Sequence, residues 1–390
     1  VASLDGKVNK PLLKANSSAI YTTTAEGEGR LLFVRNGTLM AQSFDAKSLT
    51  LAGEPSRVAE SVRVVGGLRG DFSASDNGTL IYVPRGVSES TQLTWIDRTG
   101  KSLGTVNAAG ADESLKLSDD EFPKLSPDGK RVAIDLMDPN GNGDAYVLDL
   151  ARGAKTRVTI DPGNDRYPVW SPDGNYIVWL STRGGERALY RKLASGGGQE
   201  ELLLKSDVSI MPIDWSADGK FILYMRYPPQ TRGDIWVLPL GGDRQPVLFL
   251  QTPFHETRAR FSPDRRWIAY MSNETGAYEI YVQPFPATGD KWQVSTKSGS
   301  NPQWRGDGKE LYYHADDGKQ MAVEIKGGKT FEPGLPQVLF DLREARLVSN
   351  TNYAVAKDGQ RFLFVTRPQL ASADLQFVVV TNWAASEVKK

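Results

Sequence analysis

A tetrapeptide turn recurs along this chain and constrains its fold more than any other feature. Residues 167–180 read Y-P-V-W-S-P-D-G-N-Y-I-V-W-L, so two short apolar strands flank the S-P-D-G tetrad at 171–174. Proline fixes φ at the second position of such a turn, and glycine takes the left-handed conformation that follows. The second strand is apolar on both faces, which is typical of a strand covered by protein on both sides. The stretch therefore predicts a β-hairpin with a buried returning strand.

Copies of this hairpin recur at the spacing of a propeller blade, a four-stranded sheet of about 40 to 50 residues. Consecutive turn aspartates are 45, 45, 46, 43 and 51 residues apart, at Asp128, Asp173, Asp218, Asp264, Asp307 and Asp358. Two weaker copies precede them at 72–78 and 26–29, which makes eight hairpins. The sequence predicts an all-β fold, a single β-propeller of eight blades with four antiparallel strands each. Seven blades are the alternative.

The repeats predict one domain over residues 1–390, because a propeller grows by repetition and is not limited by the usual size of a domain. Blades are expected to begin near residues 19, 70, 121, 166, 210, 257, 301 and 352. Residues 1–14 read as outer strands that complete the last blade. We expect residues 8–13 to pair with residues 377–380 and close the ring. Because the opening residues resemble half a blade, we also expect further sequence ahead of Val1.

The composition narrows the classes of partner. The chain has 47 basic and 47 acidic residues, so no net field steers it toward nucleic acid or an anionic membrane. It has no cysteine, which excludes disulfide and thiol chemistry. No apolar run reaches the roughly 18 residues that cross a bilayer, so we expect membrane attachment only through a segment ahead of this chain. The partners that remain are a protein, a peptide or a glycan.

The motifs of catalysis are missing from the sequence. The two histidines, His255 and His314, fall in different blades and in no H-E-x-x-H pattern, and no G-x-S-x-G nucleophile elbow occurs. Gly328-Lys329-Thr330 resembles the end of a phosphate-binding loop, but Val323 stands where the first glycine of that loop is required. The sequence therefore predicts a protein that is not an enzyme and that has no cofactor.

One loop has the spacing of a calcium site. Asp138, Asn140, Asn142 and Asp144 alternate in D-P-N-G-N-G-D as oxygen ligands do in a calcium-binding loop. The flanking segments read as strands, and aspartate replaces the bidentate glutamate of that motif. The favoured interpretation is a polar hairpin loop, with calcium as the alternative.

Propellers usually bind ligands at the loops that lead into the innermost strands, around the central channel. In this chain those loops carry charges of both signs and aromatic groups, which suit a small polar ligand or an extended peptide. Intramolecular salt bridges are the competing interpretation for any one of them. The candidate ligand-binding residues are Asp120, Glu121, Asp165, Arg166, Tyr167, Met211, His255, Glu256, Arg258 and Asn301.

The tetrads at 126–129, 171–174 and 216–219, each preceded by an apolar residue, resemble the repeats of TolB-like propellers, which are relatives of the WD-repeat class. Residues 31–45, 92–98 and 308–325 are similar to the carboxyl-terminal propeller of acidobacterial-type bacterial serine/threonine protein kinases. That resemblance implies a sensing or docking module beyond a membrane helix, in the periplasm or at the cell surface, with the cytoplasm as the alternative. Two other functions stay open. One is a propeller that gates a hydrolase or lyase, as in prolyl-oligopeptidase relatives, and the other is a self-associating scaffold.

Overall fold

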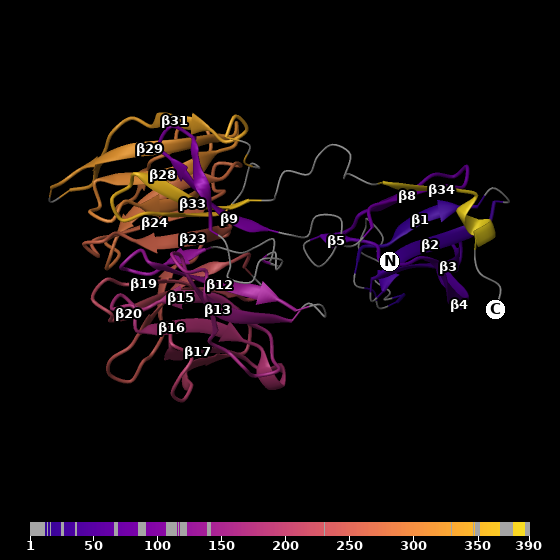
Figure 1. Ribbon diagram of the computed structural model, residues 1–390, viewed down its shortest axis with the longest axis horizontal. Helices are drawn as coiled ribbons and strands as arrows, with labels where there is room; N and C mark the ends of the chain where they lie inside the picture. Colours follow the sequence, from indigo (N-terminus) through magenta and orange to yellow (C-terminus); the bar gives the residue numbers. More distant parts are fainter. Residues whose placement is uncertain are drawn as a thin grey trace. The chain divides into compact units, whose positions relative to one another are not determined.

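The computed structural model describes residues 12–386, apart from residues 14, 16, 25–26, 36, 66–68, 85–90, 107–114, 116, 118–122, 139–141, 230, 329, 346, 348–351 and 367–376. The chain forms two compact units where the sequence predicts one domain. Val1–Glu89 and Pro368–Lys390 form the first, which we call the small unit, and Ser90–Arg367 form the second, the ring unit (Figure 1). In the described residues no helix is long and apolar enough to cross a membrane.

The ring unit is built from antiparallel strands, with a short 3-10 turn at Arg183–Gly185. Its strands are β9 (Gln92–Asp97), β10 (Ser102–Val106), β11 (Lys124–Leu125), β12 (Arg131–Met137), β13 (Gly143–Asp149), β14 (Lys155–Arg157), β15 (Asp165–Trp170), β16 (Tyr176–Ser181), β17 (Arg187–Leu193), β18 (Glu201–Ser206), β19 (Ser209–Trp215), β20 (Phe221–Tyr227), β21 (Asp234–Pro239), β22 (Val247–Leu250), β23 (Glu256–Phe261), β24 (Trp267–Ser272), β25 (Glu279–Pro284), β26 (Trp292–Gln293), β27 (Ser300–Trp304), β28 (Glu310–Ala315), β29 (Lys319–Lys326), β30 (Glu332–Pro333), β31 (Gln337–Asp341), β32 (Tyr353–Val355) and β33 (Arg361–Thr366).

Six sheets make up the described part of the ring unit. Four follow the chain in the orders β11 to β14, β15 to β18, β19 to β22 and β23 to β26. The fifth has the order β27-β28-β29-β30, with β31 also paired to β29, and we number these five blades 1 to 5 in chain order. Blade 6 has the order β10-β9-β33-β32, so its outer strands come from the start of the unit and its inner strands from the end. Arg361 of β33 is opposite Asp97 of β9, and Figure 1 shows the purple β9 beside the yellow β33. Innermost β32 contacts both β11 and β27, which closes the ring.

The turn tetrads form as the sequence predicts. The glycine is left-handed in each, with φ of 70° at Gly174 and 75° at Gly219. The Ser171 hydroxyl donates to Asp173 at 2.5 Å and accepts the amide of Tyr176 at 2.9 Å, so one side chain joins both sides of the turn. Arg265 stands where glycine is usual and has a φ of 64°. A non-glycine residue in this conformation costs about 1 to 2 kcal/mol.

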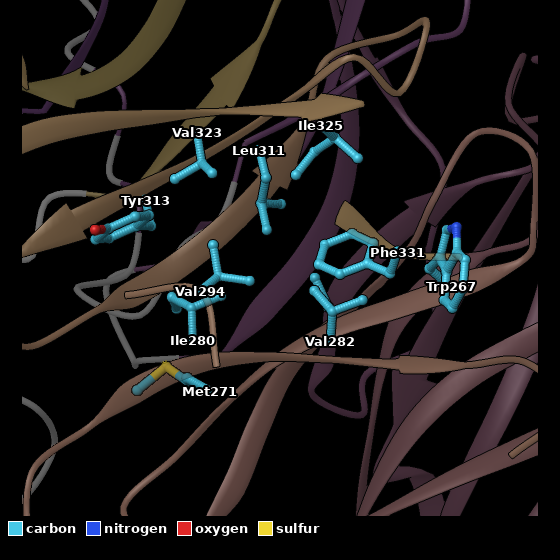
Figure 2. Close-up of a cluster of buried hydrophobic side chains, with 11 residues drawn as sticks. Trp267, Met271, Ile280, Val282, Val294, Leu311, Tyr313, Val323, Ile325 and Phe331 are labelled. Carbon is cyan, nitrogen blue, oxygen red and sulfur yellow. The ribbon is translucent and has the colours of Figure 1, made fainter. Parts of the chain in front are cut away.

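The core consists of apolar layers between neighbouring blades. Figure 2 shows the layer between blades 4 and 5, where Val282 of β25 lies near Phe331 and Leu311 of β28 lies near Val323 of β29. All six residues of β24 are buried, which fits an apolar strand covered on both faces. A corresponding layer contains Ile96 of β9 together with Tyr312 of blade 5. Full burial of one such side chain contributes about 1.5 to 3 kcal/mol.

The small unit is also β-structured. Its strands are β1 (Ile20–Thr23), β2 (Gly29–Arg35), β3 (Thr38–Asp45), β4 (Thr50–Ala59), β5 (Val64–Val65), β6 (Arg69–Gly70), β7 (Phe72–Ala74), β8 (Thr79–Tyr82) and β34 (Val378–Thr381), followed by a 3-10 turn at Trp383–Ser386. The strands β1 to β4 form one sheet in chain order, β34-β8-β7 form a second, and β5 pairs with β6. Leu32, Leu80 and Trp383 are fully buried in its core.

The all-β propeller is confirmed, but the number of blades and the closing strands differ from the prediction. The described ring has six blades, not eight or seven, and β9 pairing with β33 closes it. β34 pairs with β8, with Val379 opposite Ile81, and its expected pairing with residues 8–13 falls largely on residues that the structure does not describe. Most of residues 1–14 lie outside the described residues. The difference is an exchange of half-blades. The sequence predicts β7 to β10 as one blade and β32 to β34 as parts of another. In the structure, β7 and β8 share a sheet with β34, and β9 and β10 share one with β32 and β33.

Candidate functional site

The innermost strands bring the predicted site residues to one end of the channel. The sequence places these residues in loops, but most lie in the first half of a strand, as Tyr167 does in β15 and Arg258 in β23. The register shifts between Arg166 and Val169 and between Thr257 and Arg260, which marks a β-bulge in both strands. A bulge changes the direction of its side chains without ending the strand.

Three of the predicted residues share an unusual backbone conformation. Tyr167 and Arg258 both have φ of 59°, and Asn301 has φ of 56°. Each non-glycine residue in this region costs about 1 to 3 kcal/mol, and such strain concentrates at binding sites. The peptide group of Asn301 is also used within the ring, because its carbonyl accepts a hydrogen bond of 3.0 Å from the hydroxyl of Tyr353 in blade 6.

Asp165 and Arg166 take part in internal ion pairs. Arg166 Nε lies 2.7 Å from Asp135 Oδ2, and its guanidinium lies 4.6 Å from the centre of the Tyr167 ring. Asp165 has no exposed surface and lies 3.7 Å from Arg183. Burial raises the pKa of Asp165 to about 6. This part of the prediction therefore fits the competing interpretation, structural salt bridges.

His255 and Glu256 occupy the same end of the channel in blade 4. His255 Nδ1 lies 2.5 Å from the Tyr278 hydroxyl. Burial, and then the charges of Arg258 and Arg232, lower the pKa of His255 and keep its ring neutral. Glu256 is buried, accepts hydrogen bonds from Thr252 and Ser272, and has its pKa raised by burial. The arrangement offers hydrogen-bonding groups beside two arginines.

A cationic pair that the sequence analysis missed lies farther along the channel. Lys124 Nζ donates to the carbonyl oxygen of Ile213 at 3.0 Å, and Arg260 Nη1 donates to the same oxygen at 2.7 Å. Blade 2 separates the blades of Lys124 and Ile213, so this bond crosses the channel. Burial, reinforced by the charge of Arg260, lowers the pKa of Lys124, and burial raises the pKa of Asp214.

A sequence signal for this pair existed. Lys124, Asp214 and Arg260 all stand two residues before the serine of a turn tetrad, whereas Val169 has that place in blade 2. A charged residue at the position that the buried Val169 occupies in blade 2 indicates a special environment. A small cavity of about 20 Å³ adjoins the pair and is lined by Lys124, Tyr167, Met211, Ile213, Arg258 and Arg260. The structure thus brings three predicted residues together with the two that were missed.

The opposite end of the channel has a wider basin. It measures about 640 Å³ and lies among the turns of blades 5, 6 and 1. Arg361 lies 4.2 Å from the Trp95 ring, and Asp128, Asp307 and Asp358 surround them. From the sequence, these turns are expected only to connect the strands of a hairpin.

The remaining predicted residues have simpler outcomes. Asp120, Glu121 and Asn140 lie outside the described residues. Asp144 accepts hydrogen bonds from Arg157 at 2.7 Å and Thr159 at 3.0 Å, so its carboxylate forms contacts within the protein and not with a metal ion. The side chain of Asp138 accepts the amide of Asn142 within its own hairpin. In the part of the chain that is described, no group of three or more acidic or histidine side chains is placed to hold a metal ion.

The ring unit is a closed β-propeller with a channel lined by its innermost strands. Residues 118–235 match the family model of the TolB beta propeller domain, PD40. A protein of Agrobacterium tumefaciens assigned to TolB has a similar structure, with a TM-score of 0.56 at 20% identity over 72% of this chain and 99% of that one. The fold is therefore that of a TolB-like β-propeller.

Two curated proteins are similar in sequence over shorter stretches. Atu1656 of Agrobacterium fabrum (strain C58), named as uncharacterized, is 31% identical over 172 residues, which are 41% of this chain and 53% of that protein. YuxL of Bacillus subtilis (strain 168), named as an uncharacterized peptidase, is 27% identical over 118 residues, which are 29% of this chain and 18% of YuxL. The match thus spans about half of the first relative and a small part of the second.

Proposed function

We propose that the ring unit is a non-catalytic binding module that takes a protein, peptide or glycan at the end of the channel marked by Tyr167, His255 and Arg258. The observation that carries this proposal is the left-handed conformation of Tyr167, Arg258 and Asn301 in three inner strands. A closed ring holds these strained residues in place, and a preformed surface loses little entropy on binding. Neutral His255 and the Tyr278 hydroxyl supply hydrogen bonds beside it.

The wider setting is proposed from resemblance. A TolB-like ring, and the likeness of residues 31–45, 92–98 and 308–325 to kinase-linked propellers, support a sensing module of a larger signalling protein. The same likeness supports an extracytoplasmic location, with attachment to the membrane through another segment. The balanced charge supports a partner other than nucleic acid.

A second candidate is favoured by one observation. The matched stretch forms only 18% of YuxL and 11% of tricorn protease homolog 1 of Streptomyces coelicolor, so similar propeller sequence accompanies peptidase names in larger proteins. In that case the ring would gate access to a hydrolase. The complete reading frame separates the two candidates: a kinase and membrane helix support sensing, and a hydrolase domain supports gating.

Binding is tested with the immobilised full chain against an array of peptides of varied charge and a glycan array. We expect ligands that the Arg258→Gln variant loses and that the Arg266→Gln variant keeps. Arg266 is the matched control because it is also an arginine of blade 4. It lies in the turn after β23, where it pairs with Asp264 at 2.6 Å. If Arg266→Gln loses the same ligands as Arg258→Gln, or if no ligand binds to the native chain, the proposed end of the channel is not a binding surface.

A further inference from the structure

The wider basin, at the turn end of the channel, opens where two blades lack a large side chain. The residue before the turn tetrad is aromatic in blades 2 to 5, as Trp170, Trp215, Phe261 and Trp304. Such a ring can span two blades, since Trp170 Nε1 donates to the carbonyl oxygen of Lys124 in blade 1 at 2.8 Å. Leu125 and Val355 hold this position in blades 1 and 6. These smaller side chains leave the basin of about 640 Å³, a volume typical of ligand sites.

Two turn aspartates of the basin have a carboxylate oxygen, Oδ2, that accepts no hydrogen bond from the described residues. They are Asp128 in blade 1 and Asp358 in blade 6, whose Oδ1 atoms accept the amides of Lys130 at 3.1 Å and Gln360 at 3.0 Å. In the other four turns of the ring a side chain donates to Oδ2, and the pairs are Asn175 with Asp173, Arg265 with Asp218, Arg266 with Asp264 and Arg305 with Asp307. Three of these four donors are guanidinium groups. The two aspartates therefore lack the kind of donor that this turn has elsewhere in the ring.

Two cations of the basin make no side-chain hydrogen bond or ion pair within the part of the chain that is described. The guanidinium of Arg361 lies over the Trp95 ring, 4.2 Å from its centre, and Lys357 takes the place that proline has in other turns. Lys357 packs on Gly306, where a Cβ atom would overlap Lys357 Cγ. Both cations are exposed at the basin. Together with the two aspartates they supply two positive and two negative groups to a ligand.

We infer that the basin binds a ligand with one guanidinium and one carboxylate, the two charged groups of a carboxyl-terminal arginine. The guanidinium binds Asp128 and Asp358, as arginines of the protein bind the corresponding aspartates in other turns. The carboxylate binds Arg361 and Lys357, and Leu125 contacts the aliphatic part of the ligand. A ligand with charge of one sign would bring like charges together at one pair of these groups. This site is separate from the end of the channel proposed above.

The first test is calorimetric titration of the full chain with three probes at constant ionic strength. N-acetyl-arginine carries both charged groups, N-acetyl-citrulline replaces the guanidinium with a neutral urea of similar shape, and N-acetyl-arginine amide lacks the carboxylate. We expect N-acetyl-arginine to bind at least tenfold more tightly than either of the other two. If one of them binds as tightly as N-acetyl-arginine, or if N-acetyl-arginine does not bind, the inference is overturned.

Substitutions in the turns show whether the probe occupies the basin. Asp128→Asn and Asp358→Asn should each weaken the binding of N-acetyl-arginine about tenfold, because a charge-assisted hydrogen bond becomes a neutral one. Asp173→Asn is the matched control and should leave the affinity within twofold. Asp173 has the same place in the turn of blade 2, does not line the basin and already binds Asn175. Equal effects at Asp128 and Asp173 contradict binding in the basin.

Leu125→Trp is a second test that leaves every charged group unchanged. It introduces the residue type that Trp170 supplies in blade 2, so the ring should fold, and it fills the basin. We expect N-acetyl-arginine binding to be lost without a lower melting temperature, and retained affinity in the folded variant overturns the inference. If this variant does not fold, Asp128→Asn and Asp358→Asn carry the test. Free arginine and the tripeptide Ala-Ala-Arg then distinguish the source, because the tighter binder identifies a free amino acid or a chain end.

Discussion

Arg98 holds Glu310 through two parallel hydrogen bonds, Nη1 to Oε2 at 2.9 Å and Nη2 to Oε1 at 2.8 Å. Arg98 follows β9 in blade 6, and Glu310 begins β28 in blade 5. The Nη1 group also donates to the Tyr312 hydroxyl and to the carbonyl of Gly359. The strand that closes the ring is thus fixed to the neighbouring blade by a forked, partly buried ion pair.

Replacing Arg98 with alanine should lower the free energy of unfolding by about 2 kcal/mol, because charge-assisted hydrogen bonds to a partly buried carboxylate are lost. Urea denaturation measures the change. Lys205→Met is the control, since Lys205 and Glu186 form an exposed pair and its loss should not be measurable. Equal effects of the two substitutions would contradict a special role for the closing pair.

A fragment of residues 90–367 should fold alone. Its six sheets and the layers between them lie within the ring unit, and closure needs only β9, β10, β32 and β33. A fragment of residues 107–367, which lacks β9 and β10, should melt at a much lower temperature or aggregate, because β33 then becomes an open edge. Circular dichroism melting compares them. Equal melting temperatures would show that β9 does not close the ring.

Stability should fall in acid because of His314. It is 1% exposed and stacks on Tyr353 with a distance of 4.5 Å between ring centres. Burial lowers the pKa of His314 to about 4, whereas an unfolded chain has a value near 6.5. The unfolded state therefore binds the proton first, and stability is lost as pH falls from about 6.5 toward 4.

The variant His314→Phe isolates this contribution. Between pH 7.5 and pH 5 the native chain should lose about 2 kcal/mol more than the variant, from the difference between the folded and unfolded pKa of His314. Urea unfolding at the two pH values gives the numbers. Parallel losses in both proteins would mean that folding does not lower the pKa of His314.

Asp165 should have the opposite pH dependence. Burial raises the pKa of Asp165 to about 6, so the folded state binds the proton more tightly and stability is lost as pH rises from about 4 to 6. The variant Asp165→Asn resembles the protonated acid. Relative to the native chain it should gain about 2 kcal/mol in free energy of unfolding between pH 4.5 and pH 7.5. A difference that does not change with pH would contradict the raised pKa.

The sequence predicts the local structure of this protein better than its connectivity. The turns are predictable because Ser171, Pro172 and Gly174 each meet a backbone requirement within the same few residues. The pairing of β9 is not, since main-chain hydrogen bonds at a strand edge contain no sequence information. β9 is apolar enough to follow β8 in one blade or to lie beside β33 in another, and only the closed ring distinguishes these choices.

The repeat pattern predicts where the candidate residues lie along the blades, but it does not predict their partners. Tyr167, Met211 and Arg258 lie where the repeat places them, at the cavity. The ion pair of Arg166 with Asp135 joins different blades, and no spacing in the sequence indicates it. The bond of Lys124 to Ile213 joins blades that are not neighbours, so its formation depends on the number of blades in the ring. Counting hairpins in the sequence predicts eight blades, whereas the described ring has six.

The pairing of β34 with β8 also sets the order in which this protein is completed during synthesis. β8 emerges from the ribosome first, but the entire ring unit is made before its partner appears, a delay of about 15 to 60 s at typical elongation rates. The ring unit has all its strands by then and can fold, whereas the small unit still lacks β34. Of the two units, the one whose synthesis starts earlier is thus completed later, and until then one edge of β8 is open to chaperones or to other nascent chains.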